Sequence, residues 1–217
     1  MTSERDPRRR RVVIDANVLY AMPLADTLLS AADYSLFQLR WSADLLHEVH
    51  KTMETRGFSA RAVARRISMM AEAFADEEVR GYQDLIPQLQ LPDPDDRHVL
   101  AVAIHVQAEV IVTANVKDFP PAVLAAHGLS VQSPNAFLVD LTTQHPRQML
   151  ALVHEQADRL RRPAMSFAAL LHLLEQHAPA FSQLLSALEL EVRDRESNTP
   201  AGAPAALLDD SGATGVV

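Results

Sequence analysis

The chain has 217 residues, of which 48% are hydrophobic and 22% are charged, a composition typical of a folded globular protein. It contains no cysteine, which excludes disulfides, iron–sulfur clusters and zinc–thiolate sites, so any metal must be bound by oxygen or imidazole ligands. A net charge of −8 argues against binding nucleic acid over the whole surface. No apolar run approaches the roughly 20 residues that cross a bilayer, and the basic start lacks the apolar stretch of a secretory signal. We therefore expect a cytoplasmic protein without membrane contact.

The first predicted strand covers residues 11–15 and ends in Asp15. A β-branched apolar run that ends in an acid is typical of a buried parallel strand, which delivers a functional side chain at its carboxyl end. Apolar spacing then predicts a helix over residues 24–32, and alternation predicts a second strand over residues 36–41.

Two helices follow the second strand. Ser42 is the predicted N-cap of the first, which continues to about residue 55 and places Glu48 beside an apolar stripe. The second is expected over residues 59–75, with an apolar face that points to the core. Residues 76–94 have a less regular pattern.

The next predicted helix covers residues 97–106 and follows a stiff acidic turn at residues 92–96. A fully apolar strand is expected over residues 109–113, and a last short strand over residues 129–131. Strands that alternate with helices predict a parallel α/β sheet flanked by helices.

Beyond about residue 143 the pattern is purely helical, which indicates an appended helical domain. The final segment is rich in Pro, Ala, Gly and Ser and predicts a disordered tail. The expected organisation is a basic arm at residues 1–10, an α/β domain at 11–142, a helical domain at 143–195 and a tail at 196–217.

Polar side chains follow the two most apolar strands. The carboxyl ends of parallel strands meet at one edge of a sheet, so the residues behind them should converge there. Gathered carboxylates would repel one another and raise their own pKa values unless a cation neutralised them, and Mg²⁺ or Mn²⁺ suits oxygen ligands. The residues expected at this edge are Asp15, Glu48, Asp96, Thr113, Asn115 and Asp118.

Several motifs resemble those of the PIN-domain ribonucleases in order and spacing. They are Val-Ile-Asp-Ala-Asn-Val-Leu at residues 13–19, Glu48 within Leu-Leu-His-Glu-Val, Asp96 ahead of Val-Leu-Ala, and Thr-Ala-Asn-Val-Lys-Asp-Phe at residues 113–119. The resemblance covers about residues 11–142 and is strongest to the VapC toxins. It implies a PIN-like three-layer fold, a metal-dependent endoribonuclease of a type II toxin–antitoxin system, and a VapB-like antitoxin as partner.

The same resemblance implies roles for individual residues. Asp15 and Asp96 would be the main metal ligands, and Glu48 an acid that binds the metal or orients water. Many relatives have an acid where this chain has Asn115, so either Asn115 binds through its carbonyl oxygen or Asp118 supplies the charge.

Asn17 is expected to hydrogen-bond the strand-to-helix turn behind Asp15, with contact to metal-bound water as the alternative. His98 and His105 lie seven positions apart on one helix, which is too far for both to bind one ion. We therefore expect them to be packing or rim residues.

Arg61, Arg65 and Arg66 are candidate contacts to the RNA backbone, although helix charges are often only a solvated face. RNA is the expected substrate; the sequence allows transfer RNA or another structured RNA and does not identify the target. Met69 and Met70 are expected in the core or on an oligomer face, so a homodimer is one arrangement that the sequence allows.

Two alternatives remain open. A degenerate PIN domain would bind RNA or a protein without cleavage, which the departure at Asn115 allows. A phosphatase of the haloacid dehalogenase type would use Asp15 as nucleophile, but its motif requires an acid at the position of Asn17.

Overall fold

The computed structural model describes residues 9–160 and 164–197, and a four-stranded parallel sheet in the order β2-β1-β3-β4 forms its centre. The predicted basic arm and tail fall largely outside these ranges. Val12 pairs with Leu39 on one side and with Val110 on the other. The strands are β1 (Arg11–Ile14), β2 (Gln38–Arg40), β3 (Val110–Val112) and β4 (Ser130–Gln132).

The predicted strands and their parallel arrangement are confirmed. The first three strands are shorter than expected, and β4 is shifted by one residue. β1 and β3 lie in the middle of the sheet, and Val12, Val13 and Ile14 have no exposed surface. Their continuous apolar runs therefore reflect burial on both faces of the sheet.

The helices between the strands cover the sheet from two sides. Parallel crossovers are right-handed, so the step from β1 to β2 and the return from β2 to β3 place their helices on opposite faces. This confirms the predicted three-layer α/β fold. The first group is α1 (Ala16–Leu19) and α2 (Leu24–Asp33); the second is α3 (Ala43–Thr55), α4 (Ala60–Ala73) and α5 (Arg97–His105); α6 (Pro121–Ala125) precedes β4.

Short 3-10 helices occupy the connections, two of them in the stretch that the sequence left without a regular pattern. They are η1 (Ala75–Glu77), η2 (Gln83–Gln88), η3 (Pro94–Asp96) and η4 (Val116–Asp118).

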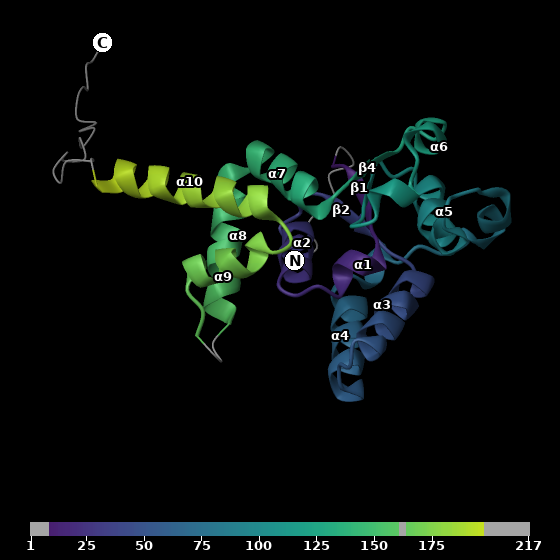
Figure 1. Cartoon of the computed structure of the whole chain (residues 1–217), viewed down its shortest axis with the longest axis horizontal. Coiled ribbons are helices and arrows are strands. Elements are labelled where there is room, and N and C mark those ends of the chain that lie inside the picture. The colour runs from purple at the N-terminus through teal and green to yellow at the C-terminus, as the bar shows by residue number, and fades with distance from the viewer. Residues whose placement is uncertain (1–8, 161–163, 198–217) are drawn as a thin grey trace, which may run out of the picture.

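The helix starts follow from local chemistry. Ser42 Oγ accepts a hydrogen bond from the backbone N–H of Leu45 at 3.2 Å, which confirms the predicted cap of α3. The predicted apolar stripe of α3 is buried and consists of Leu45, Leu46, Val49 and Met53. Helices α3 and α4 form a hairpin that extends away from the sheet (Figure 1).

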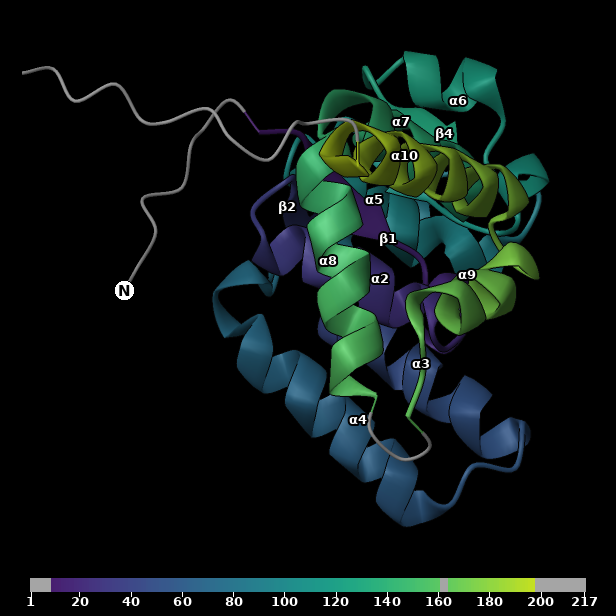
Figure 2. The ribbon, with the colours of Figure 1, turned by 90° about the vertical axis from the view of Figure 1, so that its left-hand side faces the viewer.

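The C-terminal helices gather on the side of the molecule opposite α5 and α6 (Figure 1), and Figure 2 shows α8 in front of α2. They are α7 (Pro134–Gln144), α8 (Pro146–Arg159), α9 (Phe167–Glu175) and α10 (Pro179–Ser197). No helix within the described ranges is long and apolar enough to cross a membrane.

Helix α10 extends two residues into the range that the sequence predicts for the tail. That range starts at Glu196, and the helix continues through Ser197. Ion pairs one turn apart, between Arg193 and Glu189 and between Arg195 and Glu191, support this exposed end of the helix.

The C-terminal helices share their core with the α/β part. Gln156 of α8 is 2% exposed, and its Oε1 accepts a hydrogen bond from the Thr27 hydroxyl of α2 at 2.8 Å. Its amide nitrogen donates to the Pro23 carbonyl at 3.1 Å. Because a buried amide needs both partners, this contact fixes the position of α8 on α2.

Candidate metal centre

Asp15 lies where β1 ends and α1 begins, at the point where the strand order of the sheet reverses. This is the place where open α/β sheets bind ligands. The residue is 1% exposed, and its Oδ2 accepts hydrogen bonds from the Asn17 amide at 2.6 Å and the Thr113 hydroxyl at 2.7 Å. The carboxylate therefore has a defined orientation without any ligand.

Asn17 and Thr113 connect the end of β1 with the loop after β3. Asn17 Oδ1 accepts from the backbone N–H of Ala114 at 3.0 Å, and Thr113 Oγ1 accepts from that of Asn115 at 3.0 Å. The two side chains are also bonded to each other, with 3.0 Å between Asn17 Nδ2 and Thr113 Oγ1. They hold both the loop and Asp15.

The surroundings of Asp15 favour its neutral form. Burial raises the pKa of this carboxyl, the Thr113 hydrogen bond lowers it, and the charge of Glu48 raises it, so the net shift is upward. A cation close to Oδ1 or Oδ2 would reverse this preference.

Asp96 ends η3 directly before α5, but its side chain does not cap the helix. The turn is held instead by Asp93, whose Oδ1 accepts from the backbone N–H of Asp95 at 2.9 Å. Asp96 Oδ2 is buried and has no hydrogen-bond partner among residues 9–160 and 164–197. A buried carboxylate oxygen without a partner is costly, so this atom fits a ligand that the protein itself does not supply.

The pKa of Asp96 is raised to about 7. Burial is the largest cause, and negative charge around the carboxyl adds to it. In order of decreasing effect, the charged neighbours are Asp15, Asp93, Asp118 and Glu48.

Glu48 reaches the same region from α3. Its Oε2 lies 3.2 Å from Nε2 of His98, and the His98 side chain is only 16% exposed. Burial would lower the pKa of His98, but the hydrogen bond and charge of Glu48, with the charges of Asp15 and Asp44, raise it overall. The sequence carried no signal for this contact, because the two residues lie 50 positions apart.

Asn115 and Asp118 differ in their surroundings. Asn115 is exposed, and its side chain makes no hydrogen bond to the described residues. Asp118 is half-buried at the end of η4, and its charge contributes to the raised pKa of Asp96. Of the two residues, only Asp118 contributes negative charge at Asp96.

Within the described residues, no group of three His, Asp or Glu side chains is close enough to hold one ion directly. The centre nevertheless carries the marks of a cation site, namely mutually repelling carboxylates and the unbonded Oδ2 of Asp96. These residues fit Mg²⁺ or Mn²⁺ bound partly through water, as hard cations often are in proteins.

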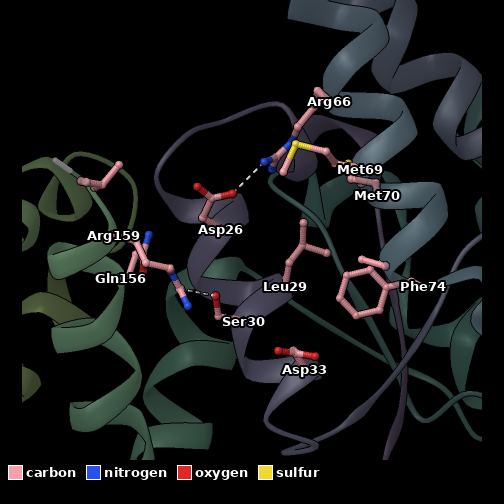
Figure 3. Close-up of a pocket in the computed structure, with 12 residues that line it drawn as sticks. Asp26, Leu29, Ser30, Asp33, Arg66, Met69, Met70, Phe74, Gln156 and Arg159 are labelled. Atoms are coloured by element: carbon pink, nitrogen blue, oxygen red, sulfur yellow. Dashed lines mark hydrogen bonds and ion pairs between the residues drawn. The ribbon is translucent and has the colours of Figure 1, made fainter. Parts of the chain in front are cut away.

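The predicted RNA-binding arginines do not share one environment. Arg61 and Arg65 are exposed on α4. Arg66 points instead toward α2, where its guanidinium lies 2.7 Å from Asp26 at the rim of a cavity of about 330 Å³ (Figure 3). The cavity lies between α2, α4 and α8, with Leu29 and Phe74 among its apolar lining residues.

Comparison with known families agrees with the fold. Residues 11–117 match the family model of the PIN domain, so this part of the chain is a PIN domain. Residues 134–187 match the family model of the VapC50 C-terminal domain, and the two matches together confirm the predicted resemblance to VapC-type PIN proteins. The second match begins with α7, inside the range that the sequence predicts for the α/β domain.

One relative is a Mycobacterium tuberculosis protein named "Putative ribonuclease VapC50". It is 34% identical over 102 residues, which are 47% of this chain and 60% of the relative. The match thus spans less than two thirds of that protein. No solved structure matches the chain significantly.

Proposed function

We propose that this protein is a metal-dependent endoribonuclease and the toxin component of a type II toxin–antitoxin system. The observation that carries the proposal is the buried, unbonded Oδ2 of Asp96 beside the charge of Asp15, at the strand ends where this fold binds ligands. The PIN-domain match and the name of the relative support a nuclease.

Asp15 and Asp96 would hold the ion. The side chains of Asn17 and Thr113 both bond to Oδ2 of Asp15 and not to Oδ1, and Asp96 offers Oδ2, which has no hydrogen-bond partner in the described part of the chain. A bound Mg²⁺ or Mn²⁺ would activate an attacking water and stabilise negative charge on the phosphate.

Glu48 and Asp118 would have supporting roles beside these two metal ligands. Glu48 is 41% exposed, and its carboxylate can accept a proton or a hydrogen bond from water. Asp118 would supply the fourth acidic position in place of Asn115, because its charge acts on Asp96 whereas the Asn115 side chain is exposed. Asn17 and Thr113 orient Asp15 and take no part in proton transfer.

The substrate would be RNA, and the regulatory partner a VapB-like antitoxin. Because the net charge is −8, contacts to the RNA backbone must be confined to a small part of the protein surface. The exposed Arg61 and Arg65 on α4 are candidates for these contacts. Arg66 is a weaker candidate because its guanidinium already pairs with Asp26.

A phosphatase that uses Asp15 as nucleophile has little support. Its general acid would stand at the position of Asn17, whose amide donates to Asp15 and cannot donate a proton as an acid does.

The test is cleavage of a structured RNA by the purified chain with and without Mn²⁺. We expect Asp15→Asn and Asp96→Asn to abolish cleavage and Mn²⁺ binding, both followed in the same preparations. Asp95→Asn is the matched control, since this exposed acid of the same turn should leave both unchanged. Cleavage at the wild-type rate in both site variants would overturn the proposal, and absence of millimolar Mn²⁺ binding by the wild type would favour the non-catalytic binding module.

A further inference from the structure

We propose that His98 is a positioning residue, which holds the Glu48 carboxylate toward the metal centre through the hydrogen bond from its Nε2. The inference rests on the proposed function, because it assigns His98 a role at that same centre. It concerns a residue that the sequence predicted to be only a packing or rim residue.

Glu48 needs such a partner. Its side chain is long and 41% exposed, and the bond to His98 at 3.2 Å is the one hydrogen bond that its carboxylate makes within the described part of the chain. An unrestrained glutamate samples many rotamers, and fixing one of them costs conformational entropy. A contact that selects one orientation in advance removes part of that cost from metal or substrate binding.

His98 is well placed to provide this contact. It lies in the first turn of α5, and residues 99–103 immediately after it are all buried where α5 packs on β1 and β3. The ring itself is 16% exposed. Its position is therefore set by a rigid part of the core, unlike that of the Glu48 side chain.

The imidazole has no competing polar contact. Nδ1 of His98 is buried and lacks a hydrogen-bond partner among the described residues, so Nε2 makes the ring's sole hydrogen bond there. A carboxylate only accepts hydrogen bonds, and Nε2 must therefore carry the hydrogen.

The bond connects two elements that each supply an acid to the centre. Glu48 comes from α3, and Asp96 lies directly before α5, two positions ahead of His98. Without this bond, the distance between the two carboxylates would depend only on the packing of α3 against α5. Carboxylates at metal sites are commonly oriented by such a second hydrogen-bonding partner.

The test compares His98→Leu, which removes the donor, with His98→Gln, whose amide nitrogen can replace Nε2. Mn²⁺ binding is measured by calorimetric titration, RNA cleavage as kcat and KM, and folding by thermal unfolding. We expect His98→Leu to weaken Mn²⁺ binding about 10-fold and to lower kcat more than it raises KM, while His98→Gln stays within about 2-fold of wild type. His105→Gln, at an exposed histidine of the same helix, should match the wild type.

Each outcome separates the two proposals. Unchanged Mn²⁺ binding and kcat in His98→Leu would overturn the role of His98 and leave the nuclease proposal standing. Equal loss in the Leu and Gln variants would also overturn it, because a direct metal ligand, unlike a positioning donor, is not replaced by an amide nitrogen. A wild type without Mn²⁺ binding would overturn both proposals.

A further pair of variants keeps the test valid if His98→Leu does not fold. Both His98→Gln and His98→Asn are polar, but the shorter Asn amide cannot reach Glu48 from the same backbone position. Mn²⁺ binding should be weaker in the Asn variant, and equal binding in the two would contradict the positioning role.

Discussion

Thr113 donates a hydrogen bond from its hydroxyl to Oδ2 of Asp15 at 2.7 Å, and the two residues follow the neighbouring strands β3 and β1. Both are buried, with 0% and 1% exposure respectively. The bond counteracts part of the effect of burial on the pKa of Asp15. It therefore stabilises the ionised carboxylate that a cation requires.

Replacement of Thr113 by valine should show this contribution. The variant keeps the shape but leaves Asp15 without its hydroxyl donor, so we expect a loss of about 2 kcal/mol in unfolding free energy at about pH 8 and weaker Mn²⁺ binding. Urea denaturation and calorimetric titration measure the two effects. Thr113→Ser retains the hydroxyl and is the control; a valine variant with wild-type values in both measurements would contradict the role of the bond.

Asp96 should make the metal-free protein less stable as the pH rises. Its pKa is about 7 in the folded protein, above the value of 3.8 for an ordinary aspartate, so the folded state binds the proton more tightly than the unfolded state. Stability that depends on protonated Asp96 is present below about pH 4 and is lost progressively as the pH rises to about 7.

Asp96→Asn removes this dependence. In the presence of EDTA we expect the variant to be more stable than the wild type by about 2 kcal/mol near pH 8, because solvent screens part of the repulsion at the half-buried Asp96. Near pH 4 the two proteins should be nearly equal in stability. Thermal unfolding across this pH range tests the expectation. Mn²⁺ should stabilise only the wild type; a constant difference between the two proteins at every pH would refute the assigned shift.

Arg66 should matter more for stability than for RNA binding. Its side chain is 15% exposed and that of Asp26 is 31% exposed, so the ion pair between them at 2.7 Å is partly shielded from solvent. Arg66→Met should lower the unfolding free energy by about 1 kcal/mol because it leaves Asp26 without its partner. Arg65→Met is the exposed control on the same helix and should leave stability unchanged. A larger loss of RNA affinity for Arg66→Met than for Arg65→Met would show that Arg66 contacts RNA.

The contact between His154 and Glu189 should stabilise the C-terminal helices above acidic pH. The Nε2 of His154 lies 2.9 Å from Oε2 of Glu189, and the imidazole stacks on Phe167 with 4.1 Å between ring centroids. The hydrogen bond from His154 lowers the pKa of Glu189 below its ordinary value of 4.5. The resulting stability is present above that value and is lost as the pH falls through the lowered pKa.

Glu189→Gln should therefore destabilise the protein by about 1 kcal/mol near pH 6, and the difference should vanish near pH 3. Urea denaturation at both pH values provides the measurement. Glu191→Gln serves as the control, since its exposed pair with Arg195 at 3.6 Å should contribute less than about 0.5 kcal/mol. An equal effect of the two variants would indicate that the His154 contact adds nothing.

Several features of the fold were predictable because they depend on short stretches of chain. β-branched apolar runs predicted β1 and β3, and Ser42 predicted the start of α3. The convergence of Asp15 and Thr113 followed from the rule that parallel strands end at one edge of the sheet. Helix α10 continues two residues past the range that the sequence assigns to the helical domain, because an exposed helix end supported by ion pairs has no apolar pattern.

The sequence by itself determined the parallel α/β fold, the helical extension and the expected acids of the centre, because apolar periodicity and motif order are local properties of the chain. Only the tertiary structure decided which polar side chains from distant parts of the chain contact one another. It brought His98 to Glu48 and Arg66 to Asp26, and it left Oδ2 of Asp96 buried without a hydrogen-bond partner among the residues that the structure describes. Such contacts depend on how α3, α4 and α5 pack, and side chains 40 or 50 positions apart carry no periodic signal of their pairing.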